Sequence, residues 1–141
     1  DSTAILLHLG DKHQKLTYPL GSADRAKMMS VICFAIDSFE QPLWSFAKHS
    51  FVHPEDIRAL EAITPALKHE FAQAVATLDK MLGDQEFIMG DEFSTADVVL
   101  GHLGGWAKGI GFGGTEGRVG EYMSRIRSRP GWKAVLKARE V

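Results

Sequence analysis

Apolar side chains recur at intervals of three and four residues along most of this chain. That period is typical of amphipathic α-helices, in which one stripe of side chains is buried. The strict alternation of apolar and polar residues that indicates a β-strand is found nowhere over a useful length. Short segments containing glycine or proline separate the helical stretches. The pattern therefore predicts an all-α fold.

The longest apolar stripe lies in a helix that is predicted to run from Ser22, its N-cap, to about His49. Pro42 lies inside this stripe and should kink the helix, because proline has no backbone N–H to donate. The stripe continues beyond Pro42, so one bent helix is expected rather than two. Cys33 also lies in this helix, and we expect its thiol to be buried and inert. The stripe consists of Met29, Ile32, Ile36, Phe39, Leu43 and Phe46.

Two further helices flank the long one. The first is expected from Asp1 to about His13, because Asp1 and Ser2 are both good N-cap residues, and it carries a short stripe of Ile5, Leu6 and Leu9. After the long helix Pro54 starts a helical stretch, and the pair Thr64-Pro65 marks either a new helix start or a bend. One apolar face then continues to a stop at Gly83. That face contains Leu67, Phe71, Val75, Leu78 and Leu82.

The clearest local signal is a helix start at residues 93–98. Ser94 and Asp97 have the spacing of a capping box, and Phe93 and Val98 that of the accompanying hydrophobic staple. We expect these residues to be structural. The helix that follows contains Gly101, Gly104 and Gly105, and glycine at an i, i+4 spacing suggests close approach of another helix or of a ligand.

The last part of the chain contains a glycine-rich segment, residues 109–117, followed by two helices. Gly111, Gly113 and Gly114 superficially resemble a phosphate-binding loop, but no strand precedes them and no Gly-Lys-Ser/Thr follows, so a plain loop is expected. A helix should run from about Glu116 to Arg127. Pro130 should start a short final helix that Trp132 anchors.

Composition fits one compact globular domain of 141 residues, and the formal net charge of −2 lacks the basic footprint of a nucleic-acid binder. No apolar run approaches the roughly 20 residues that cross a membrane, and no secretory signal is recognisable. The single cysteine is compatible with a reducing compartment. The chain begins without methionine, so we expect a fragment of a longer protein or one whose start was removed.

Histidines offer little support for a metal site. His49 and His53 are four residues apart, but Pro54 should disturb the helix at that point and no third ligand has a suitable spacing, so no metal site is expected. His102 is expected to be packed in the core helix rather than to act in catalysis.

Three segments in this order resemble the glutathione transferases, and the resemblance covers essentially the whole chain. It implies an all-helical C-terminal domain at residues 22–141, a bundle of about five to six helices. It implies further that residues 1–16 are the last helix of a thioredoxin-like domain that would precede it. The three segments are Asp1-Ser2-Thr3-Ala4-Ile5, Gly90-Asp91-Glu92-Phe93-Ser94-Thr95-Ala96-Asp97 and Arg127-Ser128-Arg129-Pro130-Gly131-Trp132.

The resemblance also implies an activity for the intact protein: conjugation of glutathione to small hydrophobic electrophiles, as in detoxification. The family's thiol-activating residue lies in the first domain, so no catalytic residue is assigned here and this chain alone should be inactive. Asp1 and Ser2 match the pair that holds the γ-glutamyl end of glutathione. A helix N-terminus does attract a carboxylate; the alternative is that the two residues only cap a helix.

Trp44, Ser45, Lys48 and Trp106 are the candidates for the electrophile pocket, since that part of the long helix faces the cleft in the family. The alternative is that the two tryptophans belong to the core or to a subunit interface and that Lys48 is solvated. The family further implies a cytoplasmic homodimer with glutathione as co-substrate and no other cofactor. Two other functions remain open: a non-catalytic binding or assembly module with the same fold, and an unrelated helical ligand-binding domain.

Overall fold

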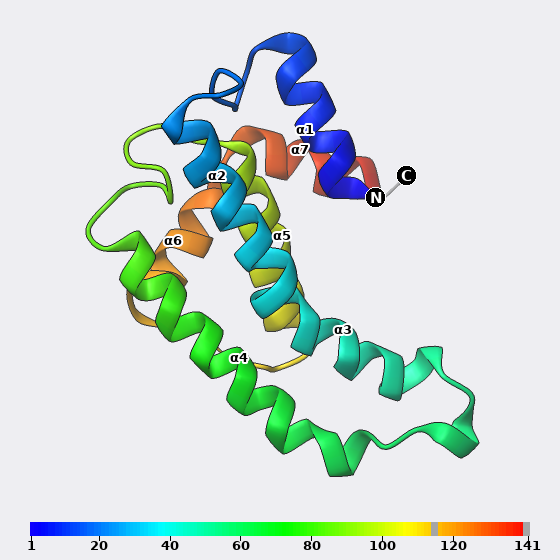
Figure 1. The fold of residues 1–141 in the computed structure, drawn as a ribbon. Coiled ribbons are helices and arrows are strands. Elements are labelled where there is room, and N and C mark those ends of the chain that lie inside the picture. Colours follow the sequence, from blue (N-terminus) through cyan, green and yellow to red (C-terminus); the bar gives the residue numbers. More distant parts are fainter. Residues whose placement is uncertain (114–115, 140–141) are drawn as a thin grey trace.

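The computed structural model describes residues 1–113 and 116–139, which form helices and connecting loops (Figure 1). Within these residues there is no strand, only an isolated bridge between Phe87 and Gly90. The predicted all-α fold is confirmed. The elements are α1 (Ser2–His13), α2 (Ala23–Phe34), η1 (Ala35–Glu40), α3 (Gln41–Ala47), η2 (Lys48–Val52), η3 (Glu55–Ile57), α4 (Leu60–Leu82), α5 (Thr95–Gly109), α6 (Gly117–Ser128) and α7 (Pro130–Arg139).

Helix α5 is the central element of the bundle. In the long rod formed by α2, η1 and α3, the first two segments pack along α5, and α4 returns beside α3. Helix α6 packs on both α4 and α5 and leads into α7, which lies at the same end of the molecule as α1 (Figure 1). In the described part of the chain, no helix combines the length and the apolar character that crossing a bilayer requires.

The core is built from apolar faces of α2, η1, α3, α4, α5 and α6. Aromatic rings meet near its middle: Phe39 and Phe71 have ring centroids 4.7 Å apart, and Phe112 lies 5.6 Å from Phe71. Burial on this scale is the main source of stability for the bundle, since each fully buried large side chain contributes about 1.5–3 kcal/mol.

The bent rod contains two π-helical segments, η1 and η2, that the sequence pattern did not reveal. Pro42 has no N–H to donate to a carbonyl in the preceding turn, and the wider π turn of η1 comes immediately before α3 begins. The predicted stripe is partly wrong. Ile36 is 39% exposed, and Met29 is only partly buried. The buried stripe is Met28, Val31, Ile32, Ala35, Phe39, Leu43 and Ala47.

One other local expectation is corrected, and one of two alternatives is excluded. Cys33 is exposed rather than buried, because it lies on the side of α2 that faces away from the core. The helix does not restart at Thr64-Pro65: α4 begins at Leu60 and runs through Pro65, and the Thr64 hydroxyl donates to the Leu60 carbonyl at 2.6 Å. The stop at Gly83 is confirmed, with a φ of 54° that favours glycine.

The capping box at the start of α5 is formed as predicted. The carboxylate of Asp97 is fully buried and accepts the backbone N–H of Ser94 at 2.8 Å and that of Ile88 at 3.0 Å. It also accepts the hydroxyl of Tyr122 on α6 at 2.7 Å, a partner that no local motif indicated. Burial, together with the charge of Asp97, raises the pKa of Tyr122 well above 10. Asp97 therefore ties the preceding loop, α5 and α6 together.

The glycines of α5 mark close helix packing. A Cβ atom on Gly101 would overlap Ile126, and one on Gly104 would overlap Met123, both on α6. Gly105 faces Trp132 of α7, whose ring atoms would lie 3.5 Å from a Cβ there. The close neighbour that the glycine spacing suggested is therefore a helix. In the glycine-rich segment that follows, Gly114 lies outside the described residues.

Candidate functional site

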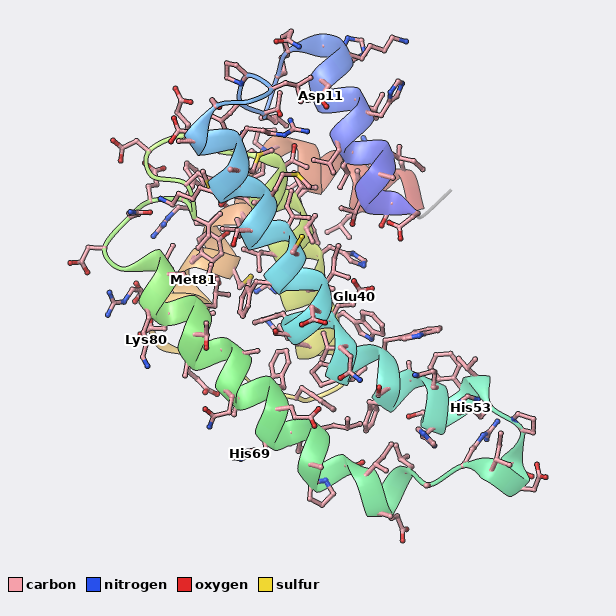
Figure 2. All side chains as sticks on the ribbon, viewed as in Figure 1. Asp11, Glu40, His53, His69, Lys80 and Met81 are labelled. Atoms are coloured by element: carbon pink, nitrogen blue, oxygen red, sulfur yellow. The ribbon has the colours of Figure 1, made fainter. Side chains whose placement is uncertain are left out.

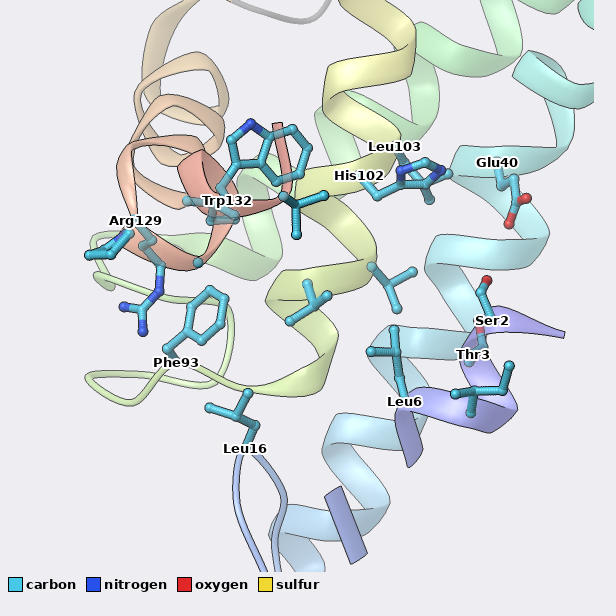
Figure 3. A pocket seen from close by; sticks show the side chains of 17 residues that line it. Ser2, Thr3, Leu6, Leu16, Glu40, Phe93, His102, Leu103, Arg129 and Trp132 are labelled. Carbon is cyan, nitrogen blue, oxygen red and sulfur yellow. The ribbon is translucent and has the colours of Figure 1, made fainter. Parts of the chain in front are cut away.

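A cavity of about 810 Å³ lies between α1, α5 and α7. Most of the side chains that line it are apolar, and they come from parts of the chain more than 120 residues apart (Figure 3). This concave apolar feature is therefore the candidate binding site. Its apolar walls are formed by Ile5, Leu6, Leu16, Phe93, Val98, Val99, Leu103, Ile126, Pro130, Trp132 and Val135.

Polar groups are gathered toward one end of this cavity. Ser2 and Thr3 come from the first turn of α1, Glu40 from the last residue of η1, and His102 from α5, and Figure 3 shows all four on the same side of the cavity. This end combines a helix start, whose first N–H groups have no partner within the helix, with one carboxylate and one imidazole. The arrangement can hold a ligand or a protein segment that is apolar over most of its length and polar at one end.

Arg129 lines another part of the cavity. Its guanidinium lies over the ring of Phe93, 3.8 Å from the ring centroid, and Phe93 in turn makes an edge contact with Phe87 at 5.4 Å. A cation over an aromatic face contributes about 0.5–2 kcal/mol. The predicted staple partners Phe93 and Val98 both line the cavity as well.

Helix α1 is held in place at its far end. Arg25 of α2 donates two hydrogen bonds to the carboxylate of Asp11, at 2.6 Å and 3.0 Å, and also one to the hydroxyl of Thr17. Figure 2 shows the position of Asp11 on α1. The hydrogen bonds from Arg25 lower the pKa of Asp11 below its ordinary value. The carbonyl of Leu16 accepts two hydrogen bonds from Thr95, at the start of α5. These contacts set the position of α1 beside the cavity.

The two residues predicted to hold glutathione lie at the open start of α1. Asp1 caps the helix, with one carboxylate oxygen accepting the N–H of Thr3 at 2.9 Å. Ser2 is exposed and lines the polar end of the cavity. The capping role and a binding role are compatible here, because the second carboxylate oxygen of Asp1 has no hydrogen bond within the described part of the chain.

The four candidates for the electrophile pocket lie elsewhere, and none of them lines this cavity. Trp44 is 46% exposed on α3, Lys48 is partly buried, and Trp106 packs against the core from α5. Ser45 is buried, and its hydroxyl accepts a hydrogen bond from the side chain of Gln41 at 3.1 Å. Their grouping in one pocket stays a prediction.

One of the histidines, His102, lies in a different environment from the one predicted. His102 is exposed at the cavity and not packed in the core, so that interpretation was wrong. His49 of η2 and His53 lie in the segment between α3 and α4, and their ring centroids are 5.0 Å apart. Figure 2 shows His53 in this projecting part of the molecule. The His49 Nδ1 atom accepts the N–H of Ala59 at 3.1 Å, which accounts for its orientation.

Sequence patterns missed Glu40, His102 and Arg129 as cavity residues. The π turn η1 changes the direction of the side chains that follow it, so no regular helical period could place Glu40 at the cavity. Arg129 lies in a segment that the resemblance quoted without assigning it a role.

A family model described as the glutathione S-transferase C-terminal domain matches residues 61–138. None of the curated protein sequences matches the chain. Among solved structures, a sphingomonad glutathione S-transferase in complex with glutathione is similar, with 28% identity and a TM-score of 0.81 over 100% of this chain and 68% of that one.

A beta-class glutathione S-transferase from Sphingomonas chungbukensis has 29% identity and a TM-score of 0.80, over 98% of this chain and 66% of that one. The ternary complex of BphK, a bacterial glutathione transferase, shares the fold with a TM-score of 0.85 at 16% identity, over 100% of this chain and 68% of that one. The chain thus spans about two thirds of the length of each of these structures.

Proposed function

The chain belongs to the family of glutathione S-transferase C-terminal domains, and from that premise we propose that the intact protein is a glutathione transferase. Its reaction would join the sulfur of glutathione to a small hydrophobic electrophile. The co-substrate is a tripeptide whose polar ends need recognition and whose thiol needs activation. Recognition of one end can be traced to residues of this chain.

The observation that carries this proposal is the open N-terminus of α1 at the polar end of the cavity. The first N–H groups of a helix have no partner within the helix and attract a carboxylate. Asp1 and Ser2 would therefore hold the γ-glutamyl end of glutathione, Ser2 by its hydroxyl and backbone N–H, and Asp1 by its free carboxylate oxygen.

We also propose the domain organisation that the resemblance implies. Residues 1–16 would be the last helix of a thioredoxin-like domain, and residues 22–141 the helical domain. Helix α1 packs on the bundle mainly through α5, and its own apolar side chains Ile5 and Leu9 are 58% and 44% exposed. An exposed apolar face of this kind beside an apolar cavity is expected to be covered by another part of the protein or by a partner. The occupant would be the remainder of the thioredoxin-like domain, which the longer relatives have room to contain.

The electrophile would bind further along the rod, beside Trp44 and Lys48 of the α3–η2 segment and Trp106 of α5. An exposed tryptophan near a lysine suits a flat apolar molecule with a polar substituent. Buried Ser45 would act there only by supporting the backbone. The choice among electrophiles in such a pocket depends mostly on the shape of the pocket.

We further propose that the intact protein is a cytoplasmic homodimer that uses the outer face of the α2–α3 rod for pairing. Cys33 is exposed on α2, and an exposed single thiol is best preserved in a reducing compartment. No metal or prosthetic group enters the proposed reaction.

The test is an assay of glutathione conjugation with a chromogenic electrophile, in which the 141-residue chain is compared with the full-length protein. We expect turnover only from the full-length protein. A free thiol is only a few per cent ionised at neutral pH, so the group that stabilises the thiolate must be supplied by the upstream domain.

Turnover by the chain alone at the rate of the full-length protein would contradict this division of labour. Binding of glutathione by the full-length protein without turnover for any electrophile would favour the non-catalytic module instead.

A further inference from the structure

The segment that joins α1 to α2 contains two residues with an unusual backbone. Gln14 and Leu16 have positive φ angles of 51° and 58°. This left-handed conformation costs free energy for any residue that has a Cβ atom. Gln14 is the C-cap of α1, a position where the conformation is common. Leu16 caps no helix, so contacts with the rest of the structure must offset its strain.

The contact that holds Leu16 comes from Thr95, the first residue of α5. The backbone N–H of Thr95 donates to the Leu16 carbonyl at 2.8 Å, and its hydroxyl donates to the same oxygen at 2.7 Å. Thr95 is only 3% exposed, so water competes little for these bonds. The capping box of α5 is formed by Ser94 and Asp97 and does not require the Thr95 hydroxyl. That hydroxyl is therefore available to fix the segment after α1.

A second group of contacts fixes the same end of α1. Arg25 of α2 is 9% exposed and donates to both carboxylate oxygens of Asp11 and to the hydroxyl of Thr17. Gly10 is buried, and a Cβ atom on it would lie 3.5 Å from the hydroxyl oxygen of Thr95. The C-terminal end of α1 is thus attached to both α2 and α5.

The N-terminal end of α1 has no comparable attachment (Figure 1). Within residues 1–113 and 116–139, no hydrogen bond or ion pair joins Asp1, Ser2 or Thr3 to another helix. A helix rises 1.5 Å per residue, so Ser2 lies about 13 Å along the axis from Asp11. A rotation of roughly 5° about the attached end would move Ser2 by about 1 Å, a displacement large enough to impair a binding site.

We propose that Thr95 is a positioning residue for glutathione. By holding the Leu16 carbonyl, its hydroxyl keeps α1 in the orientation that presents Asp1 and Ser2 to the γ-glutamyl end. This inference rests on the proposed function. Thr95 does not line the cavity, so its effect on the ligand is transmitted through α1.

The experiment measures steady-state conjugation by the full-length protein, with glutathione varied at a saturating concentration of a chromogenic electrophile. We expect Thr95→Val to raise KM for glutathione about threefold to tenfold, the range by which one lost hydrogen bond can shift the orientation of α1. The value of kcat and the KM for the electrophile should be unchanged, because saturating glutathione selects the correct orientation. Thr95→Ser keeps the hydroxyl and should restore the wild-type KM.

Thr64→Val is the matched control. It removes a hydroxyl that donates to the Leu60 carbonyl within α4, far along the chain from α1, and should leave KM for glutathione unchanged. Should Thr95→Val not fold, Arg25→Lys carries the same expectation, because it weakens the other attachment of the same end of α1.

An unchanged KM for glutathione in Thr95→Val would overturn the inference and leave the proposed function intact. So would an equal rise in Thr64→Val, because that indicates a general loss of stability. If the wild type binds glutathione without turnover, the Kd from calorimetry takes the place of KM in the same comparison. A wild type that neither binds nor conjugates glutathione would overturn the proposed function, and this inference with it.

Discussion

At the scale of single residues, Asp97 is the most connected polar group of the bundle. Its carboxylate is fully buried and accepts hydrogen bonds from both the N–H and the hydroxyl of Ser94, from the N–H of Ile88 and from the hydroxyl of Tyr122. A buried charge is tolerated when its lone pairs are satisfied in this way. Only the part involving Ser94 is a helix cap, and the rest joins separate elements.

The two members of the capping box should therefore differ in their effect on stability. Ser94→Ala removes one capping side chain and should lower the free energy of unfolding by about 1 kcal/mol. Asp97→Ala leaves buried donors on Ile88 and Tyr122 without an acceptor and should cost about 3 kcal/mol or more. Denaturant midpoints of the two variants measure this difference. Equal losses would mean that the bonds of Asp97 beyond the cap contribute nothing.

The pair formed by Asp11 and Arg25 should make stability depend on pH. Its hydrogen bonds lower the pKa of Asp11 below the ordinary value of 3.8, so the stabilisation is present above that value and is lost as pH falls through the folded-state pKa. We expect Asp11→Asn to be less stable than wild type near pH 7, and the difference to shrink below about pH 4. Urea unfolding across this range checks the expectation. Asp56→Asn is the control, because this aspartate is exposed and forms no ion pair within residues 1–113 and 116–139.

At the scale of elements, sequence patterns located the helices well where local chemistry defines their ends. Asp1, Ser22 and Ser94 are N-caps as predicted, and Gly83 is a stop. These signals act within one turn and need no knowledge of the fold. The Thr64-Pro65 pair carried an equally good local signal, yet α4 runs through it, because packing of the long helix on α3 outweighs one missing hydrogen bond.

The residues of the candidate site were harder to predict, because their positions depend on tertiary structure rather than on local signals. The resemblance directed attention to Asp1 and Ser2, and Ser2 does line the cavity. Glu40 could not be found, because its direction depends on the π turn of η1, which no apolar period records. Arg129, directly before α7, and Trp132 of α7 reach the cavity because this end of the chain folds back to line it together with α1, more than 120 residues earlier in the sequence.

The contact between α5 and α6 gives a prediction at this scale. Gly101→Ala would place a methyl group against Ile126, whose branched side chain has little freedom to move. Overpacking of this kind costs about 1–3 kcal/mol, more than the roughly 1 kcal/mol that alanine gains over glycine in a helix. Gly109→Ala is the matched control, because nothing lies within 4 Å of a Cβ atom there. Thermal unfolding should show a loss for the first variant and no loss for the second.

At the scale of the whole molecule, α1 differs from the other helices. It adds little to the core, and among the described residues an ion pair of Asp11 with Arg25 of α2 and the hydrogen bonds between Thr95 and the carbonyl of Leu16 hold it in place. Several of its apolar side chains, and those of α7 across the cavity, remain in contact with water. Ile5, Leu9, Val135 and Leu136 are between 44% and 60% exposed. In the intact protein the proposed thioredoxin-like domain would cover this surface.

The last prediction follows from that uncovered surface: the 141-residue chain should self-associate. Apolar area that a partner would normally bury is available to a second copy, and each 100 Å² removed from water is worth about 2.5 kcal/mol before the entropy of association is subtracted. The same chain could also pair through the α2–α3 rod, so the experiment must distinguish association through the α1 face from association through the rod.

Light scattering of wild type should give a mass above the 15.5 kDa of one chain at high concentration. Replacing Ile5 and Leu9 with serine should reduce that mass if the α1 face is responsible, whereas Leu20→Ser, an equally drastic change at a 76% exposed loop position, should not. A mass of one chain at every concentration would argue against both faces, and a mass unaffected by the α1 variant would assign association to the rod.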